Sequence, residues 1–126
     1  MKQFKLGEME MAFAEIIWDS APVTSGELVK LCEEKLEWKK STTYTMLKRL
    51  CQREIFENDG GTVKVLISKD EFKAAQSEEF LDEHFSGSLP MFLTAFTKHK
   101  KLSAKEIEEI KSLIDNYKED YLWDLV

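Results

Sequence analysis

Cations and hydroxyl groups gather in one stretch of this chain, WKKSTTYTMLKRLCQR, which spans residues 38–53. The stretch holds five basic side chains and no acid, although the whole chain has 18 basic and 24 acidic residues and a net charge of −6. Lysine and arginine bind phosphate groups, and hydroxyl groups hydrogen-bond to phosphates or to base edges. Because the field that attracts a nucleic acid is local, an acidic chain can still carry such a surface. The residue types therefore indicate contact with a polyanion.

The spacing of apolar residues decides which of these side chains face solvent. Four residues recur at three- and four-residue steps, the pattern of a helix face packed on a core. They are Thr43, Met46, Leu47 and Leu50. The opposite face is then free to bind, and the helix N-terminus adds a partial positive charge that favours a phosphate. Together with a lysine on a following hairpin, the expected DNA-binding residues are Lys39, Lys40, Ser41, Thr42, Tyr44, Thr45, Lys48, Arg49 and Lys64.

A plainer interpretation of these charges is a solvated helix face, which is what most charged helices present. Three features favour DNA instead. Acids are absent rather than balanced, the exposed positions before Lys48 carry hydroxyl groups, and the helix is third in a helix-helix-helix-hairpin order. None of the three is specific alone, but together they favour DNA.

Three helices are expected to position this surface. Apolar periodicity predicts a helix over residues 8–19 and, after a break at a proline, a second helix over residues 27–36. Thr24 and Glu27 stand in capping-box spacing at the start of the second helix. Ser41 is expected to cap the third helix, which carries the basic stretch.

A hairpin is predicted directly after the third helix. The segments IFEN and TVKVLIS flank Asp59-Gly60-Gly61, a sequence whose positive φ angles suit a tight turn. A hairpin this small is not stable alone, so it must pack against the helices. Residues 1–68 therefore have the order of a winged helix-turn-helix DNA-binding domain. The expected fold class is mostly α, with that domain followed by a helical dimerisation region.

The second part of the chain, residues 69–126, differs in charge and apolar content. Residues 1–68 carry 10 basic and 11 acidic side chains, whereas residues 69–126 carry 8 and 13. The latter are predicted to form three helices with more large apolar groups than so small a unit can bury. These helices could pack back onto the first domain.

An isologous dimer in which two copies complete each other's core is the favoured alternative, because such dimers are the commonest assembly and helix-turn-helix proteins use them. An apolar tail at residues 121–126 could pack on the dimer or bind a partner. The expected dimerisation residues are Phe80, Leu89, Phe92, Leu93, Phe96, Ile107, Ile110, Leu113, Ile114 and Tyr117.

Several function classes find no support in the sequence. Cys32 and Cys51 sit within periodic apolar segments, so free thiols are expected rather than a disulfide or a metal site. His84 and His99 have no nucleophile or ligand at useful spacing, so no enzyme, no metal and no cofactor are expected. No apolar run approaches the roughly 20 residues of a membrane helix, and the N-terminus lacks a signal-peptide core. We therefore expect a cytoplasmic protein that does not enter a membrane.

The motif T-x-x-T-x-L-x-R-L at residues 42–50 resembles the penicillinase-repressor (BlaI/MecI/CopY) family of bacterial transcriptional regulators. EMEMAFAEIIWDSAPVTSGELV is similar to the first two helices of that family, and GSLPMFLTAF followed by LSAKEIEEIKSLI is similar to its dimerisation region. The resemblance covers nearly the whole chain. It implies a homodimer with two winged-helix heads that binds double-stranded DNA at a palindromic operator and blocks transcription.

The chain also departs from the family pattern. Ala95-Phe96 stands where the β-lactam-responsive branch has a cleaved Asn-Phe bond, and the C-terminal tail lacks the cysteines of the copper-responsive branch. Glu54 stands where the family usually has glycine after the third helix. Neither family inducer is therefore indicated. A second hypothesis is a winged-helix module that binds a protein partner without specific DNA binding, and salt dependence separates the two, because only DNA binding weakens steeply with ionic strength.

Overall fold

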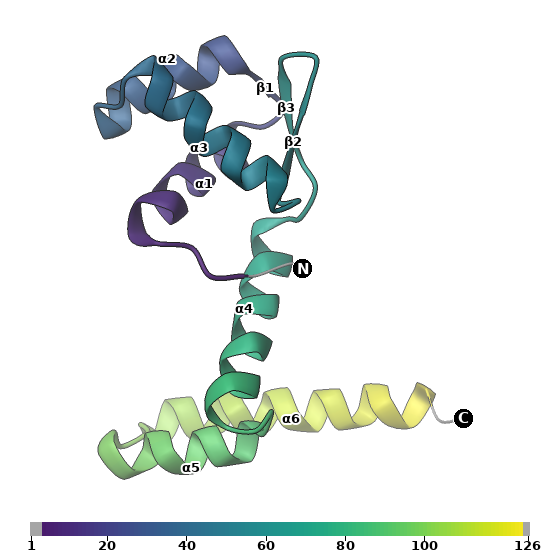
Figure 1. Ribbon diagram of the computed structural model, residues 1–126. Coiled ribbons are helices and arrows are strands. Elements are labelled where there is room, and N and C mark those ends of the chain that lie inside the picture. The colour runs from purple at the N-terminus through teal and green to yellow at the C-terminus, as the bar shows by residue number, and fades with distance from the viewer. Residues whose placement is uncertain (1–3, 125–126) are drawn as a thin grey trace.

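The computed structural model describes residues 4–124, with side chains described as far as Tyr117. Within this span the chain forms a head of three helices and a small sheet, followed by three further helices that we call the limb (Figure 1). The limb begins with α4 (Lys69–His84), which leads away from the head to α5 (Leu89–His99) and α6 (Ala104–Asp124). This is a winged helix domain joined to a helical region, as the sequence predicts.

The helices of the head are α1 (Glu8–Ser20), α2 (Ser25–Leu36) and α3 (Lys40–Gln52). The hydroxyl of Thr24 caps α2 by accepting a hydrogen bond from the backbone N–H of Glu27. The expectation that Ser41 caps α3 is wrong. Lys39 is the N-cap, in extended conformation, and its carbonyl already accepts a bond from the N–H of Thr43, so Ser41 lies inside the first turn.

The sheet has the strand order β1-β3-β2 and is antiparallel throughout. Its strands are β1 (Val23–Thr24), β2 (Phe56–Asp59) and β3 (Thr62–Val65). The hairpin of β2 and β3, which we call the wing, turns at Gly60 and Gly61, with φ angles of +59° and +95°. β3 is shorter than predicted, because the N–H groups of Leu66 and Ile67 both turn back to the carbonyl of Ile55. β1 was not predicted at all.

The core of the head lies between the three helices and the sheet. Its largest fully buried side chains include Phe13, Ile17, Leu28 and Phe56. The two cysteines are free thiols, as expected. Burial raises the pKa of both, so they stay protonated near neutral pH.

One aromatic side chain of α4 is buried in the head. Phe72, in the first turn after the Ser68 capping box, is fully buried against Phe4 and Trp18, with ring centroids 5.7 Å and 5.4 Å apart. The indole N–H of Trp18 also donates to the carbonyl of Ile67 just before α4. The head therefore takes part of its core from the helix that leaves it.

α5 and α6 lie at the far end of α4 and do not fold back over the head (Figure 1). The alternative of packing onto the first domain is not what the chain does. The predicted apolar tail at residues 121–126 is not a separate element, because α6 runs through Asp124. Its side chains, and residues 125–126 altogether, lie outside the described residues.

Glu54 ends α3 in a conformation that suits glycine. Its φ is +61°, its N–H donates to the carbonyl of Cys51, and the N–H of Ile55 donates to the carbonyl of Leu50. This pair of bonds is the Schellman arrangement, whose left-handed position is usually glycine. Left-handed backbone costs a non-glycine residue about 1–2 kcal/mol. The chain therefore keeps the turn expected of a glycine and tolerates the strain.

Replacing Glu54 with glycine should relieve this strain. We expect Glu54→Gly to raise the free energy of unfolding by about 0.5–1 kcal/mol, because part of the gain is offset by greater freedom of the unfolded chain. Glu54→Ala is the matched control, since it removes the same exposed side chain but keeps a Cβ. Urea denaturation at equal protein concentrations measures both. A glycine variant no more stable than the alanine variant would show that the left-handed turn is not strained.

Candidate nucleic-acid interface

The packing of α3 leaves one of its faces open to solvent. Thr43, Leu47 and Leu50 are buried in the head, and Met46 is half-buried, as the apolar spacing predicts. The opposite face carries no acid in its first turn. All nine residues expected to bind DNA are exposed: Lys39, Lys40, Ser41, Thr42, Tyr44, Thr45, Lys48, Arg49 and Lys64.

Tyr44 ties α3 to two other parts of the head. Its hydroxyl lies 3.3 Å from Oγ of Ser25, the first residue of α2. The backbone N–H of Ser25 in turn donates to the carbonyl of Gly61 in the wing, at 2.8 Å. Ser25 was not among the predicted site residues, because its place at the start of α2 matters only once Tyr44 is folded against it. Tyr44 therefore supports the site while staying reachable from solvent.

The remaining polar groups of α3 are held in different ways. The hydroxyl of Thr45 donates to the carbonyl of Ser41 at 2.9 Å, so its methyl group and the oxygen lone pairs are what it can offer a base. Nζ of Lys40 lies 5.9 Å from the centre of the Tyr44 ring, within cation–π range. Among the described residues, the guanidinium of Arg49 makes a weak contact, 3.7 Å from Sδ of Met46, and it can swing to a base or phosphate.

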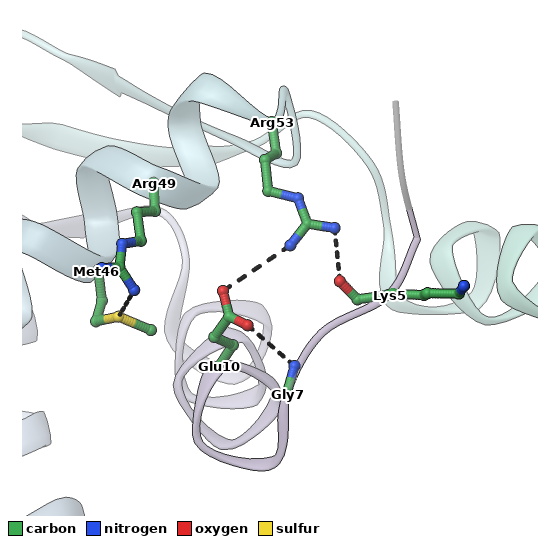
Figure 2. A network of polar contacts seen from close by, with 6 residues as sticks. All are labelled: Lys5, Gly7, Glu10, Met46, Arg49 and Arg53. Atoms are coloured by element: carbon green, nitrogen blue, oxygen red, sulfur yellow. Dashed lines mark hydrogen bonds and ion pairs between the residues drawn. The ribbon is translucent and has the colours of Figure 1, made fainter. Parts of the chain in front are cut away.

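Arg53, the last cation of the basic stretch, turns inward rather than to solvent. Figure 2 shows its guanidinium between the carboxylate of Glu10 and the carbonyl of Lys5. The bond to that carbonyl measures 2.6 Å, and the separation from Glu10 is 3.9 Å. Glu10 also accepts a hydrogen bond from the N–H of Gly7. Arg53 therefore belongs to the framework that holds the N-terminal segment, and the exposed basic face of α3 ends before it.

The wing offers DNA little positive charge. Nζ of Lys64 lies 2.9 Å from the carboxylate of Asp59, and this hydrogen bond raises the pKa of Lys64. Glu57 stands directly opposite Lys64 in the sheet. Within the wing one lysine therefore faces two acids, so Lys64 must leave Asp59 before it can meet a phosphate. The charge available to DNA is concentrated on α3.

The residues expected to dimerise lie on all three helices of the limb. Seven of the ten are exposed, and Phe92, Leu93 and Ile110 are half-buried. Phe92 packs edge-on against Phe80 and Phe85, with centroid distances of 6.2 Å and 5.5 Å, and it contacts Phe96 at 5.8 Å. Phe85 was missed, because it follows Phe80 by five residues and so does not share its helix face. These rings form an aromatic cluster at the junction of α4 and α5.

The head and the limb are both covered by one comparison with known proteins. A family model described as penicillinase repressor matches residues 6–116, from just before α1 into α6. The chain belongs to the penicillinase repressor family. This is a family of transcriptional repressors rather than of enzymes.

Curated relatives in the penicillinase repressor family match over nearly their full length. The penicillinase repressor of Bacillus licheniformis is 24% identical over 118 residues, covering 90% of this chain and 92% of the relative. The penicillinase repressor of Staphylococcus aureus is 25% identical over 119 residues, covering 91% and 94%. The methicillin resistance regulatory protein MecI of Staphylococcus aureus strain Mu50 is 20% identical over 118 residues, covering 90% and 96%.

The residues that the structure describes form neither a membrane-spanning helix nor a metal-binding cluster. No helix among them is both long and apolar enough to cross a membrane. In the same part of the chain, no group of three or more histidine, cysteine, aspartate or glutamate side chains is placed to hold a metal ion.

The inward position of Arg53 makes it a stabilising residue. We expect Arg53→Ala to lower the free energy of unfolding by about 1–3 kcal/mol, because it removes a charged donor and leaves the carbonyl of Lys5 without it. Lys48→Ala, an exposed cation on the same helix, should change stability by no more than about 0.5 kcal/mol. Chemical denaturation of both variants tests this. Equal effects would mean that the contacts of Arg53 add nothing to the folded state.

Proposed function

We propose that this protein is a homodimeric transcriptional repressor that binds a palindromic DNA operator through the exposed face of α3. The observation that carries the proposal is the composition of that face. Four exposed cations and four hydroxyl-bearing residues share it, and no acid lies between residues 38 and 53. A solvated helix face has no reason to exclude carboxylates in a chain whose net charge is −6.

The distribution of charge supports contacts with DNA mainly through α3 rather than through the wing. Lys39, Lys40 and Lys48 would neutralise phosphates, whereas the acids of the wing repel them. With three or four such contacts in each of two heads, about six to eight phosphates would be neutralised. Affinity should then fall by about 10³-fold or more between about 50 and about 200 mM salt.

Base recognition would come from the middle of the helix. Arginine commonly donates two hydrogen bonds to O6 and N7 of guanine, and a threonine methyl can contact the methyl of thymine. Arg49 is weakly held, and Thr45 has its hydroxyl proton bonded to the backbone. Together with Thr42 they would read the major groove. Tyr44 and the cations would fix the register on the backbone.

Dimerisation is proposed because the limb of a single chain buries too few side chains to be stable in water. No side chain of α5 is buried, and none of those described on α6 is. Leu113, Ile114 and Tyr117 are 70%, 55% and 71% exposed. Isolated helices of 11 residues, the length of α5, are marginal without packing. A second copy related by two-fold symmetry would cover these surfaces and place two heads on two half-sites.

A mobility-shift titration tests the function directly. The full chain is titrated against DNA upstream of its own reading frame, at low and physiological salt, with unrelated competitor DNA. We expect a salt-sensitive complex that survives the competitor. A complex that competitor abolishes, or none, would favour the alternative, a winged-helix module that binds a protein partner.

Arg49 should contribute specificity rather than general attraction. We expect Arg49→Ala to weaken operator binding by about 1–3 kcal/mol and to relax the preference for one base pair of each half-site. Lys39→Ala should instead weaken binding to all DNA sequences nearly equally. It should also reduce the slope of log affinity against log salt concentration by about 1 for each head. Titrations against operator variants at several salt concentrations separate the two effects. An unchanged affinity in the Arg49 variant would remove this residue from the interface.

Phe96 should support dimer formation. Phe96→Asp replaces an aromatic ring, 39% exposed and packed on Phe92, with a carboxylate. Because burying this charge in a dimer interface is costly, we expect monomers by analytical ultracentrifugation. Operator affinity should fall by about a hundredfold or more, because the two heads no longer bind as one unit. Thr94→Asp, with the same charge change two residues away on α5, is the matched control. A dimeric Phe96→Asp variant would place the interface elsewhere.

A further inference from the structure

The N-terminal residues 4–7, which we call the strap, run from α1 to the side of α4 (Figure 1). The backbone N–H of Phe4 donates to the carboxylate of Glu79 at 3.2 Å. Nζ of Lys5 lies 2.8 Å from the carboxylate of Glu83. The strap therefore contacts α4 at Glu79 and Glu83, two acids one helical turn apart.

The other side of the strap is fixed to the head. The carbonyl of Lys5 accepts the 2.6 Å bond from Arg53 at the end of α3 (Figure 2). The Phe4 ring packs on Phe72, the α4 side chain that is buried in the head. Gly7 is held by Glu10, which also faces Arg53. A single segment thus connects the end of the helix that would read DNA with the middle and far turns of the helix that leads to the limb.

We infer that the strap fixes the angle between the head and α4, and that it thereby sets the half-site spacing that the dimer accepts. The inference rests on the proposed function, since spacing has meaning only for a dimer on an operator. Glu79 and Glu83 act here as positioning residues, because neither belongs to the DNA-binding face.

The geometry explains why the existing contacts of α4 are not enough. Apart from the strap, the contact of Phe72 with Trp18 and the Lys69–Glu15 pair, 3.4 Å apart, hold only the first turn of the helix, so the helix can pivot there. Glu83 lies eleven residues beyond Phe72, about 16 Å along the axis. At that distance, a movement of about 3 Å at Glu83, which would break the contacts with the strap, corresponds to a tilt of about 10°.

Such a tilt is large on the scale of DNA. α4 has 16 residues and is about 24 Å long, so a 10° rotation about its far end moves the head by about 4 Å. One base-pair step rises about 3.4 Å. Without the strap the two heads would adapt to half-sites at several spacings. With it they would favour one.

No single contact in the strap is strong. Side chains of Lys5 and Glu83 are 66% and 39% exposed, and exposed ion pairs contribute little alone. Restraint comes from several contacts acting at different points along α4. A variant must therefore remove more than one of them.

The test compares operators that differ only in the distance between half-sites. The full chain and the double variant Glu79→Ala/Glu83→Ala are titrated against the best operator and against versions with about two base pairs added or removed, which rotates one half-site by about 70°. We expect the unaltered chain to lose about tenfold or more in affinity on the altered operators, and the variant to lose less than about threefold.

Glu78→Ala/Asp82→Ala is the matched control. Both acids are exposed, lie on the same helix with the same four-residue spacing, and make no bond to the strap. The control should keep the spacing preference of the unaltered chain. A reversed pair adds a rescue: Lys5→Glu should flatten the preference, and Lys5→Glu/Glu83→Lys should restore it. A merely destabilised protein would not be rescued by exchanging two charges.

A measurement without DNA separates this inference from the proposed function. A spin label at exposed Glu34→Cys, with Cys51→Ala to leave only the buried Cys32, reports the distance between the heads of a free dimer. We expect a narrow distribution in the unaltered strap and a broad one in Glu79→Ala/Glu83→Ala.

Two distributions of equal width, or a spacing preference that the double variant keeps, would overturn the role of the strap while leaving the repressor function intact. A chain that shows neither a dimer signal nor operator binding would overturn both.

Discussion

The burial of Phe72 is the contact on which the arrangement of this molecule depends. The residue belongs to the first turn of α4, yet its ring completes the core of the head between Trp18 and Phe4. A boundary drawn at residue 68 follows the secondary structure but not the packing. Head and limb share a side chain, so the point at which α4 leaves the head is part of the fold of the head itself.

Few contacts also hold α3 in place. Its buried face is short, with three fully packed residues, and its outer face is held by few bonds. Tyr44, Ser25 and the carbonyl of Gly61 connect α3, α2 and the wing through a chain of two hydrogen bonds. A helix that binds DNA, as proposed for α3, cannot bury its outer side chains, so it is held from its ends and flanks.

Sequence patterns predicted the elements well wherever one residue type decides the local structure. Periodic apolar residues identified the helices, and Gly60-Gly61 identified the turn of the wing, because few other residues adopt positive φ. The inner face of α3 followed from the positions of Thr43, Leu47 and Leu50.

What could not be predicted depends on residues far apart in the chain. β1 is two residues long and exists only because it pairs with β3. The inward turn of Arg53 depends on Glu10 and Lys5, and the pairing of Lys64 depends on Asp59 across the wing. A charge count treats all these cations alike, whereas the fold separates those that face solvent from those that hold the framework.

The unburied side chains of α5 and α6 have a consequence for how much protein the cell must keep. A folded state completed by a second copy has a stability that rises with protein concentration. In the proposed dimer, dilution would remove not only operator occupancy but also the folded limb, and the unfolded segment would be open to proteolysis. Below the dissociation constant the dimer concentration varies with the square of the total, so halving synthesis would cut the active form about fourfold. Control over genes would thus be lost sharply rather than in proportion to the amount of repressor.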